Sequence, residues 1–504
     1  MQRDGHQKSL WQITSTSSIS SSTKIRANTD VIVVGAGITG CTTALELARA
    51  GVECSLIEAQ TIGFGTTGGT TAHLNTLLDH TYPEIESNFG KEGSRTLASA
   101  LKKTLDHIAE NVSSLAIDCG HEWKDGLLFS QDSKETEELQ KIFEATQRAG
   151  IQVEWAGDLP IATQYDKVMR IPRQGQFHPL RYINALAAEF IRLGGTLMEN
   201  CRVQKIDTGD TVVAHTSRGE IRAKRLIWAT HIPPGINLLH FRCAPYRSYA
   251  VAVELASSEY PDALIYDMKD PYHYYRSQVI DGRKWLIVGG EDHKTGHEEN
   301  TDECFDRVIA HARQIFSIAS VGPKWSSQYF ENTDGLPYIG TLPGNADNVM
   351  VATGFGGNGI TLGTLAAMVL TDRIVKGGSD LDELFSPGRL SPIAGFSDFV
   401  KENADVIGHM ISKPFLADKI EGLGEMKNNE GRLVKYDGDQ LALYKDETGK
   451  VHALDPTCPH AKCTVKWNNA ERSWDCPCHG SRFSVDGELL TGPSTHDLKR
   501  VDLK

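Results

Sequence analysis

The chain has 504 residues, of which 40% are hydrophobic and 23% are charged, and its formal net charge is −13. A chain of this length is expected to contain more than one domain and a sizeable core. The excess of negative charge argues against a nucleic-acid partner. No apolar run reaches the roughly eighteen residues that a membrane-spanning helix needs. These totals are typical of a globular protein without a transmembrane segment.

Residues 1–28 are polar, rich in serine and threonine, and lack the apolar region of a secretory signal. We expect a poorly ordered N-terminal arm here, although Leu10, Trp11 and Ile13 could dock it onto the body. Six of the ten cysteines are scattered over the first 400 residues, which favours reduced core cysteines of a cytoplasmic protein. The other four crowd into 21 residues near the C-terminus and need a chemical reason.

Residues 30–59 follow the order strand, glycine turn, helix, strand and acid. Gly35 permits a tight turn after a β-branched strand, and Gly37 lets the backbone approach a pyrophosphate at the helix N-terminus. Gly40 lets helix and strand pack closely, and Glu58 can accept a hydrogen bond from a ribose hydroxyl. The sequence therefore predicts a dinucleotide-binding unit, the alternative being a turn that binds nothing.

Two further segments are rich in glycine. Residues 63–75 directly follow the nucleotide unit, and their small polar side chains suit a loop that contacts a polar ligand, unless the loop is merely solvated. Residues 348–375 predict a second strand, glycine turn and helix, whose N-terminus can face an anionic group. Because no second full glycine fingerprint with a downstream acid occurs, we expect no separate nicotinamide-binding domain.

The remaining segments suggest how the chain is organised. Residues 93–150 have a mostly helical pattern, and the buried-strand pattern of residues 225–230 could rejoin the nucleotide-binding sheet. Residues 243–290 predict an antiparallel sheet, rich in aromatics, which could wall a substrate pocket or form an ordinary sheet core. Glycine and proline interrupt residues 386–421, which predict a linker to a compact β-rich module over residues 422–504.

The C-terminal module carries two short loops with two cysteines each. Two thiolates and two imidazoles can hold a structural zinc ion, or a Rieske [2Fe–2S] centre with the thiolates on one iron and the imidazoles on the other. Each loop has one cysteine more than a zinc site would use, namely Cys463 and Cys478. The pattern favours the iron–sulfur centre, with zinc as the alternative, and the four candidate ligands are Cys458, His460, Cys476 and His479.

This module, residues 422–504, resembles a Rieske domain of the type with an inter-loop disulfide. The resemblance implies that the two thiolates bind the inner iron, that the two imidazoles bind the solvent-side iron, and that Cys463 and Cys478 form the disulfide. Ser481 matches the family serine that donates to a bridging sulfur, whereas Phe483 replaces the family tyrosine. Because fewer donors to the cluster sulfurs lower the potential, we predict one below that of quinol-oxidising members, within the Rieske range of about −150 to +300 mV.

Residues 29–385 resemble FAD-dependent oxidoreductases of the D-amino-acid oxidase type, which include glycine oxidase and sarcosine oxidase. The resemblance implies an α/β Rossmann-type FAD-binding domain with an inserted antiparallel-sheet substrate domain (α+β), followed here by the small all-β Rieske domain. This combination resembles a bacterial group of Rieske-containing FAD oxidoreductases. The residues implied to hold FAD are Gly35, Gly37, Ile38, Thr39, Gly40, Glu58, Ala59, Gly65, Thr66, Thr67, His73, Val203, Gly354, Gly357, Gly359, Ile360 and Thr361.

His73 ends a stretch similar to the one through which dimethylglycine and sarcosine dehydrogenases link FAD covalently, but Ala72 replaces the tryptophan of that stretch. We expect a non-covalent flavin. In this family an arginine or tyrosine on the sheet facing the flavin holds the substrate, and the candidates are Tyr249, Tyr275 and Arg276. No general base is assigned, because hydride transfer from a neutral amine needs none on the protein.

The resemblance predicts a cytoplasmic flavin dehydrogenase. A C–H bond next to an amine would give hydride to the flavin, and single electrons would then pass through the Rieske centre to an external acceptor, a protein or a quinone. In the first alternative a carrier reduces the flavin and the Rieske centre feeds a partner enzyme. The others are a redox sensor whose cluster gates a protein contact and a simple oxidase that uses O₂. Substrate, acceptor and oligomeric state are not determined by the sequence.

Overall fold

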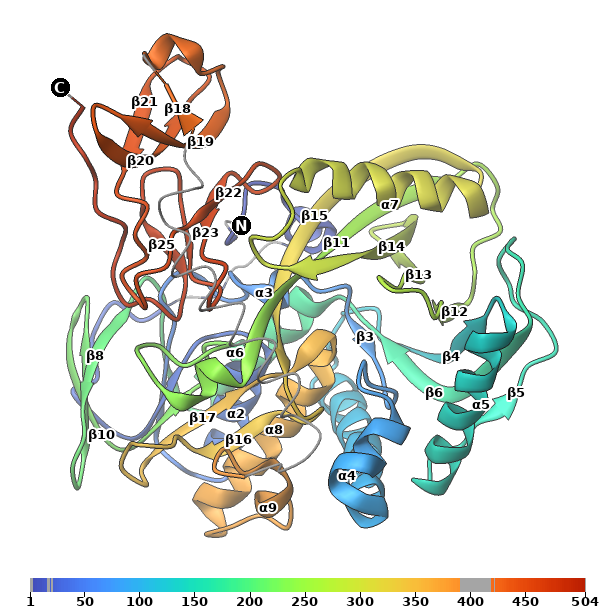
Figure 1. Cartoon of the computed structure of the whole chain (residues 1–504). Helices are drawn as coiled ribbons and strands as arrows, with labels where there is room; N and C mark the ends of the chain where they lie inside the picture. Colours follow the sequence, from blue (N-terminus) through green and yellow to red (C-terminus); the bar gives the residue numbers. More distant parts are fainter. Residues whose placement is uncertain (1–2, 16–18, 20, 390–417, 421, 504) are drawn as a thin grey trace.

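The computed structural model describes residues 3–15, 19, 21–389, 418–420 and 422–503. These residues form sheets of eight, nine, four and four strands. In Figure 1 the eight-stranded sheet and its helices lie in the lower part, the nine-stranded sheet lies above and to the right, and the C-terminal strands lie at the upper left. Within these ranges no helix is both long and apolar enough to span a membrane. The fold class predicted from the sequence is confirmed.

The eight-stranded sheet contains the predicted dinucleotide-binding unit. Its strands are β1 (Asn28–Val34), β2 (Cys54–Ile57), β7 (Thr196–Met198), β8 (Val203–Asp207), β9 (Val212–Thr216), β10 (Gly219–Trp228), β16 (Tyr338–Thr341) and β17 (Val349–Thr353). The order is β16-β17-β10-β1-β2-β7, with β8 and β9 beside β10. Ile227 of β10 pairs in parallel with Val33 of β1. The expectation that residues 225–230 rejoin this sheet is therefore confirmed.

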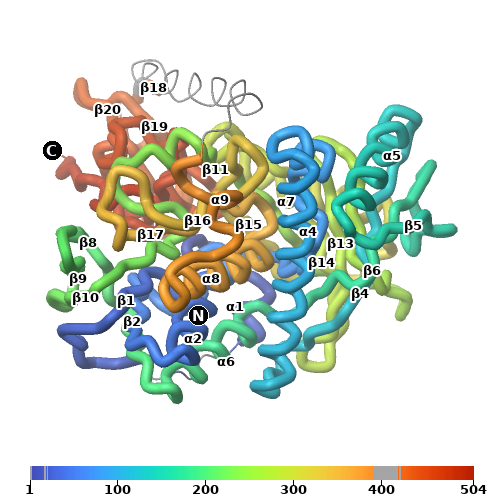
Figure 2. The backbone as a smooth tube through the Cα atoms, turned by 90° about the horizontal axis from the view of Figure 1, so that it is seen from below, coloured from blue at the N-terminus to red at the C-terminus, as the bar shows by residue number. Residues whose placement is uncertain are grey.

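Helix α2 (Ile38–Arg49) packs against both α6 (Pro179–Arg192) and α8 (Gly359–Val375) beside this sheet, and Figure 2 shows the three helices. Helix α8 approaches α2 closely at Gly363, since a Cβ there would lie 2.6 Å from Thr39 Oγ1. The second strand, glycine turn and helix predicted over residues 348–375 are present as β17, η2 and α8. The short elements nearby are α3 (Thr66–Gly69), η1 (Leu238–Phe241), η2 (Gly356–Asn358) and α9 (Asp382–Phe385).

The nine-stranded sheet is larger than the aromatic-rich strands predicted. Its strands are β3 (His73–Leu74), β4 (Glu122–Ser130), β5 (Glu154–Trp155), β6 (Lys167–Gln176), β11 (Cys243–Leu255), β12 (Ala263–Tyr266), β13 (Tyr274–Ile280), β14 (Arg283–Lys294) and β15 (Ile318–Asn332). The order is β15-β11-β14-β13-β12-β4-β6-β3, with β5 beside β6. Helix α7 (Thr301–Ile315) packs on β11 and β14.

The mostly helical pattern of residues 93–150 was only partly right. It corresponds to α4 (Tyr82–Ser114) and α5 (Ser133–Arg148), but strand β4 lies between the two helices. Strand β4 pairs with β6 and β12, and its Leu128 packs with Leu139 and Ile142 of α5. Pairing with strands distant in the sequence decides the conformation here, which a local pattern does not reveal.

The C-terminal module consists of two small sheets. One contains β18 (Asp418–Lys419), β19 (Glu430–Tyr436), β20 (Asp439–Lys445) and β21 (Val451–Leu454), and the other contains β22 (Lys466–Asn468), β23 (Ser473–Asp475), β24 (Arg482–Phe483) and β25 (Leu489–Thr491). A short helix, η3 (Leu423–Glu425), precedes β19. Most of the predicted linker, residues 386–421, lies outside the described residues.

The N-terminal arm departs from the expected poor order over residues 3–15. Its helix α1 (Leu10–Thr14) begins with a capping box at Ser9. Leu10 and Trp11 are buried, whereas Ile13 is 56% exposed. The Trp11 indole donates to the Thr70 carbonyl at 2.5 Å. The arm is therefore docked against the glycine-rich loop that follows the nucleotide unit.

Candidate functional site

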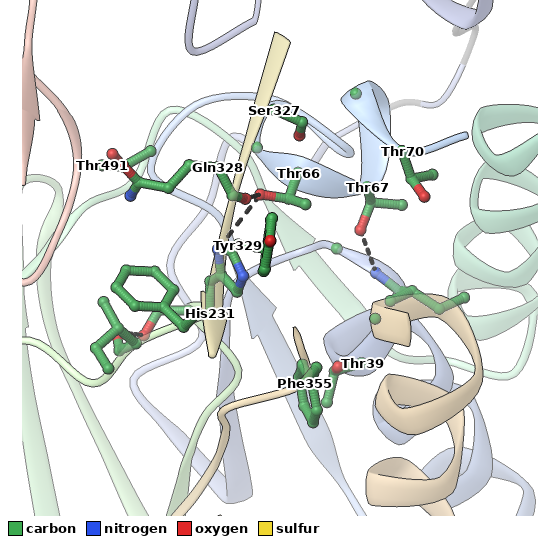
Figure 3. A pocket seen from close by; sticks show the side chains of 18 of the residues that line it. Thr39, Thr66, Thr67, Thr70, His231, Ser327, Gln328, Tyr329, Phe355 and Thr491 are labelled. Carbon is green, nitrogen blue, oxygen red and sulfur yellow. Dashed lines mark hydrogen bonds between the residues drawn. The ribbon is translucent and has the colours of Figure 1, made fainter. Parts of the chain in front are cut away.

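A long cavity runs between the two large sheets. Its lining comes from the turn between β1 and α2, from α3, from β11, β14 and β15, from the turn before α8, and from residues 489–495 of the C-terminal module. Figure 3 shows Thr67 and Thr39 on one side of it and His231, Gln328 and Tyr329 on the other. The predicted FAD residues that line it are Gly35, Gly37, Ile38, Thr39, Glu58, Ala59, Gly65, Thr66, Thr67, His73, Val203, Gly357, Gly359 and Ile360.

The nucleotide end of the cavity has the chemistry that a dinucleotide needs. Glu58 Oε2 accepts from the Ala36 N–H at 2.8 Å, which holds the carboxylate beside the glycine turn. Burial raises the pKa of Glu58, although two backbone N–H groups act against the shift. The N-cap residue of α2 is Gly37 and that of α8 is Asn358, and neither caps its helix with a side-chain hydrogen bond. The Ile38 N–H of α2 donates to Thr67 Oγ1 at 3.0 Å. Both helices present their positive ends toward the cavity, which fits an anionic cofactor such as FAD.

Three of the predicted residues lie beside the cavity and do not line it. A Cβ at Gly40 would lie 1.8 Å from the Gly35 carbonyl oxygen, so this glycine serves the close packing of α2 on β1. Gly354 has φ +74° and its carbonyl accepts from the Asn332 side chain at 2.7 Å. The Thr361 hydroxyl accepts from the Asn75 N–H at 3.3 Å. These contacts shape the cavity wall.

The three substrate-holding candidates also lie away from the cavity. The hydroxyl of Tyr249 contacts His293 Nε2 at 3.0 Å, and the hydroxyl of Tyr275 contacts His311 Nε2. Arg276 donates to the carbonyls of Thr71 and Ala72, both at 2.7 Å. All three side chains are completely buried.

The physical reason is the alternation of side chains along a strand, which sends neighbouring residues to opposite faces. Ser248 and Tyr274, each one position before a tyrosine candidate, line the cavity instead. Arg276 shares the face of Tyr274, but it lies farther along β13 and fixes the glycine-rich loop in place. The geometry of the cavity therefore favours Ser248 and Tyr274 as substrate contacts over the three residues expected from the sequence, Tyr249, Tyr275 and Arg276.

Several cavity residues were not predicted. Strand β15 contributes Gln328 and Tyr329, β14 contributes Asp292, and the loop before α4 contributes Asp79. Burial raises the pKa of Asp292 to about 7 and, together with the charge of Glu331, that of Asp79 to about 6. The sequence offered one signal for Asp292, because two carboxylates, Glu291 and Asp292, directly follow the predicted strand ending in Gly289-Gly290. Residues 318–332 were not recognised as a strand, so the sequence did not indicate that Gln328 and Tyr329 would face the cavity.

The four candidate cluster ligands come together at one edge of the C-terminal module. The Cys458 and Cys476 side chains are buried and in contact, and this contact lowers the pKa of Cys458. The imidazole rings of His460 and His479 lie 4.9 Å apart between centroids. Their Nδ1 atoms are buried and have no hydrogen-bond partner among the described residues. Two thiols and two unpartnered imidazole nitrogens fit a Rieske cluster, whose irons would satisfy them.

The surroundings of the ligands match the Rieske resemblance in two more respects. Cys463 and Cys478 form a disulfide, with Cα atoms 6.5 Å apart, which joins the two ligand loops. The Ser481 hydroxyl interacts with the Cys458 sulfur and accepts from the Ser494 N–H at 2.9 Å. Phe483 is completely buried in the same core.

The cluster loops face the flavin body. The Gly235 carbonyl lies 3.0 Å and His240 Nδ1 lies 3.1 Å from His460 Nε2. The Gln328 side chain, which lines the cavity, donates to the Gly480 carbonyl at 2.9 Å. The cavity and the cluster site therefore share a wall.

Comparison with protein families agrees with both sites. Residues 30–373 match the model of the FAD dependent oxidoreductase family, and residues 419–502 match the Rieske [2Fe-2S] domain. FAD and a Rieske cluster are therefore the cofactors of this protein.

Individual relatives agree with the family models. The "Putative Rieske 2Fe-2S iron-sulfur protein YhfW" of Bacillus subtilis (strain 168) is 33% identical over 94% of this chain and 93% of its own length. Gamma-glutamylputrescine oxidoreductase of Escherichia coli (strain K12) is 25% identical over 71% of this chain and 86% of its own. Glycine oxidase from Geobacillus kaustophilus has the same fold, with a TM-score of 0.59 at 20% identity over 72% of this chain and all of its own. This chain belongs to the FAD dependent oxidoreductase family and carries a C-terminal Rieske [2Fe-2S] domain.

Proposed function

We propose that this protein is a FAD-dependent dehydrogenase that oxidises a small amine-type substrate and passes the electrons through its Rieske cluster to an external acceptor. One observation carries the proposal: Gln328 lines the flavin cavity and donates a hydrogen bond at 2.9 Å to the carbonyl of Gly480, the residue that follows the cluster ligand His479. Short through-protein distances favour electron transfer within one chain. The name of gamma-glutamylputrescine oxidoreductase supports an amine as substrate.

FAD accepts two electrons at once, and the cluster carries one electron at a time. The residues of this chain would hold the two cofactors next to each other. Glu58 and the positive N-terminal end of α2 fit the nucleotide half of FAD. His460 and His479 would hold the iron that faces the flavin body, where Gly235 and His240 contact His460.

An anaerobic absorbance titration with amines, N-methyl amino acids and D-amino acids tests this function. We expect bleaching of the flavin band, followed by loss of the oxidised-cluster absorbance. The matched control is Cys476→Ser, which removes a cluster ligand, so that the flavin should bleach without a second phase. If no compound bleaches the flavin but dithionite does, the amine proposal fails. Reduction by a carrier alone would favour the reverse direction of electron flow.

The flavin linkage can be tested independently. His73 lines the cavity and its Nδ1 lies 2.6 Å from the Tyr266 hydroxyl. We expect a non-covalent flavin, so acid precipitation should release the yellow chromophore into the supernatant. A chromophore that stays with the wild-type protein and is released from His73→Ala would contradict this. The acceptor class, protein or quinone, and the cytoplasmic location stay predictions.

A further inference from the structure

Part of the cavity is strongly acidic. We call this part the acidic chamber, and its residues are Asp79, Ser248, Tyr272, Tyr274, Asp292 and Tyr329. Among the described residues that line the whole cavity, the single lysine or arginine is Arg202. Arg202 lies at the nucleotide end, where its charge acts on Glu58. The acidic chamber therefore has two carboxylates and no basic side chain of its own.

Asp292 is held by hydroxyl groups from two neighbouring strands. Ser248 of β11 donates to its Oδ1, and Tyr329 of β15 donates to its Oδ2 at 2.9 Å. Tyr274 lies 3.0 Å from the Ser248 hydroxyl. Because the Ser248 proton is used on Asp292, Tyr274 donates to Ser248. The hydroxyl protons of Ser248, Tyr274 and Tyr329 are therefore all used in hydrogen bonds within the chamber, so none of the three is available to a ligand.

The backbone makes room for this arrangement at Gly289. A Cβ there would lie 2.1 Å from Cζ of Tyr274, so the tyrosine ring lies across β14 only because residue 289 is glycine. This position brings the Tyr274 hydroxyl to Ser248. The register of the sheet therefore builds the hydrogen-bond chain around Asp292.

The turn before α8 offers a backbone donor, but Asp79 already uses it. The Gly357 N–H donates to Asp79 Oδ2 at 2.6 Å, and the Tyr272 hydroxyl lies 3.5 Å from Oδ1. His80, one residue farther along the chain, contacts Glu331 at 2.9 Å; the charge of His80 lowers the pKa of Asp79, and that of Glu331 raises it. A carboxylate that entered the chamber would find few donors and two negative charges.

His73 provides an independent sign of a ligand that donates. The Tyr266 hydroxyl donates to Asn75 Oδ1 at 2.9 Å, so it accepts from His73 Nδ1 at 2.6 Å. The proton of the imidazole is therefore on Nδ1, and Nε2 carries a lone pair. His73 Nε2 is buried and has no hydrogen-bond partner among the described residues, and the ring lines the same cavity. It is an unused acceptor.

We propose that the acidic chamber binds the substrate as a cation, with an ammonium group of the substrate paired with the Asp292 carboxylate. We further propose that this substrate has no carboxylate on the carbon that bears the amine. The proposal rests on the proposed function and narrows its substrate class from amines and amino acids to amines. An ammonium supplies N–H donors and positive charge, which are what Asp292, Asp79 and His73 Nε2 lack. An α-amino acid would bring a third carboxylate to a chamber that already holds Asp292 and Asp79.

Binding of two non-oxidisable probes to the flavin-loaded protein tests the proposal. Butyltrimethylammonium and butyrate are small aliphatic ions of opposite charge, and each is titrated while the flavin absorbance is recorded. Because the quaternary cation has no N–H donor, the pair tests the charge preference of the chamber. We expect saturable perturbation by the cation at a concentration at least tenfold lower than by the anion. In Asp292→Asn the dissociation constant of the cation should rise at least tenfold. Asp292→Glu, which keeps the charge, should restore most of the affinity.

The matched control is Asp306→Asn, which removes an exposed carboxylate on α7 and should leave both dissociation constants unchanged. Equal or tighter binding of butyrate by the wild-type protein would overturn the proposal, whether or not Asp292→Asn folds. So would a cation affinity that Asp292→Asn does not change while its flavin content and melting temperature remain normal.

The failure of this inference differs from failure of the proposed function. If N-methyl or D-amino acids bleach the flavin and amines without a carboxylate do not, the dehydrogenase stands and the cation proposal falls. If the cation binds through Asp292 and no amine bleaches the flavin, the binding site stands and the dehydrogenase falls.

Discussion

Two clusters of charged side chains lie in the interior of this protein, and they differ in one respect. At the junction of the N-terminal arm, the nine-stranded sheet and the Rieske domain, three arginines and three acids form a chain of ion pairs with distances of 2.9 to 3.5 Å. Its members are Arg3, Asp4, Arg247, Glu471, Asp475 and Arg482, whose side chains are at most 3% exposed. The acidic chamber has carboxylates without arginines.

The pKa values show what the difference means. Burial alone would raise the pKa of Asp4 and Asp475, but the neighbouring arginines outweigh burial, so both values are lowered. Burial raises the pKa of Asp292 to about 7, because no arginine opposes it. A buried charge with a partner in the protein is part of the structure, and one without a partner is available to a ligand.

The largest expected effect comes from breaking the paired cluster. Arg482→Met leaves Asp4 and Asp475 buried without their nearest cation, which should destabilise the protein by about 3–5 kcal/mol. Urea unfolding followed by tryptophan fluorescence measures the change. Arg173→Met is the control, because Arg173 pairs with Asp106 while both side chains are more than half exposed, and its loss should cost less than about 1 kcal/mol. Equal costs would mean that the junction is not held by its charges.

An arginine placed in the acidic chamber should reverse its charge preference from cations to anions. Tyr272 lines the chamber and its hydroxyl lies 3.5 Å from Asp79. In Tyr272→Arg the guanidinium should pair with the carboxylates and lower their pKa values. We expect at least a tenfold loss of butyltrimethylammonium affinity and a gain in butyrate affinity. Tyr272→Phe removes the hydroxyl without adding charge, and it should leave the preference for the cation in place.

The pH dependence of cation binding should follow the unpaired carboxylates. Asp292 and Asp79, with pKa values of about 7 and about 6, are largely protonated at pH 5 and ionised at pH 8. His80 faces them with Glu331 and has a pKa well above its ordinary value, while the pKa values of Tyr272, Tyr274 and Tyr329 are raised, so these groups change little over this range.

Affinity for butyltrimethylammonium should therefore rise about tenfold from pH 5 to pH 8, since a cation binds the ionised form. The ligand-free protein should respond in the opposite direction. A folded-state pKa above the unfolded value contributes stability at low pH, which is lost as the pH rises through 7. An affinity that is flat over this range, or falls, would place the cation elsewhere.

The comparison also explains what the sequence could predict. The glycine turns and the two cluster loops are local, and their chemistry depends on spacings of a few residues, so the FAD and Rieske domains were recognisable. The paired cluster joins Asp4 to Arg482 over 478 positions, which only the folded chain brings together. The face of each strand was equally hidden, because the pairing of β11 with β14 shifts register between Arg247 and Tyr249.

The smallest expected effect concerns Tyr249. If the register of β11 were shifted by one residue, the side chain of Tyr249 would lie in the chamber. Its hydroxyl contacts His293 at 3.0 Å on the opposite face of the sheet, so Tyr249→Phe should cost only about 0.5–1.5 kcal/mol of stability. Flavin reduction rate and cation affinity should stay within about twofold of wild type, whereas Ser248→Ala, one residue earlier, should weaken cation binding several-fold because Asp292 loses a donor. If Tyr249→Phe slows flavin reduction and Ser248→Ala does not, the register of β11 is shifted by one residue and the acidic chamber has been assigned to the wrong face of the sheet.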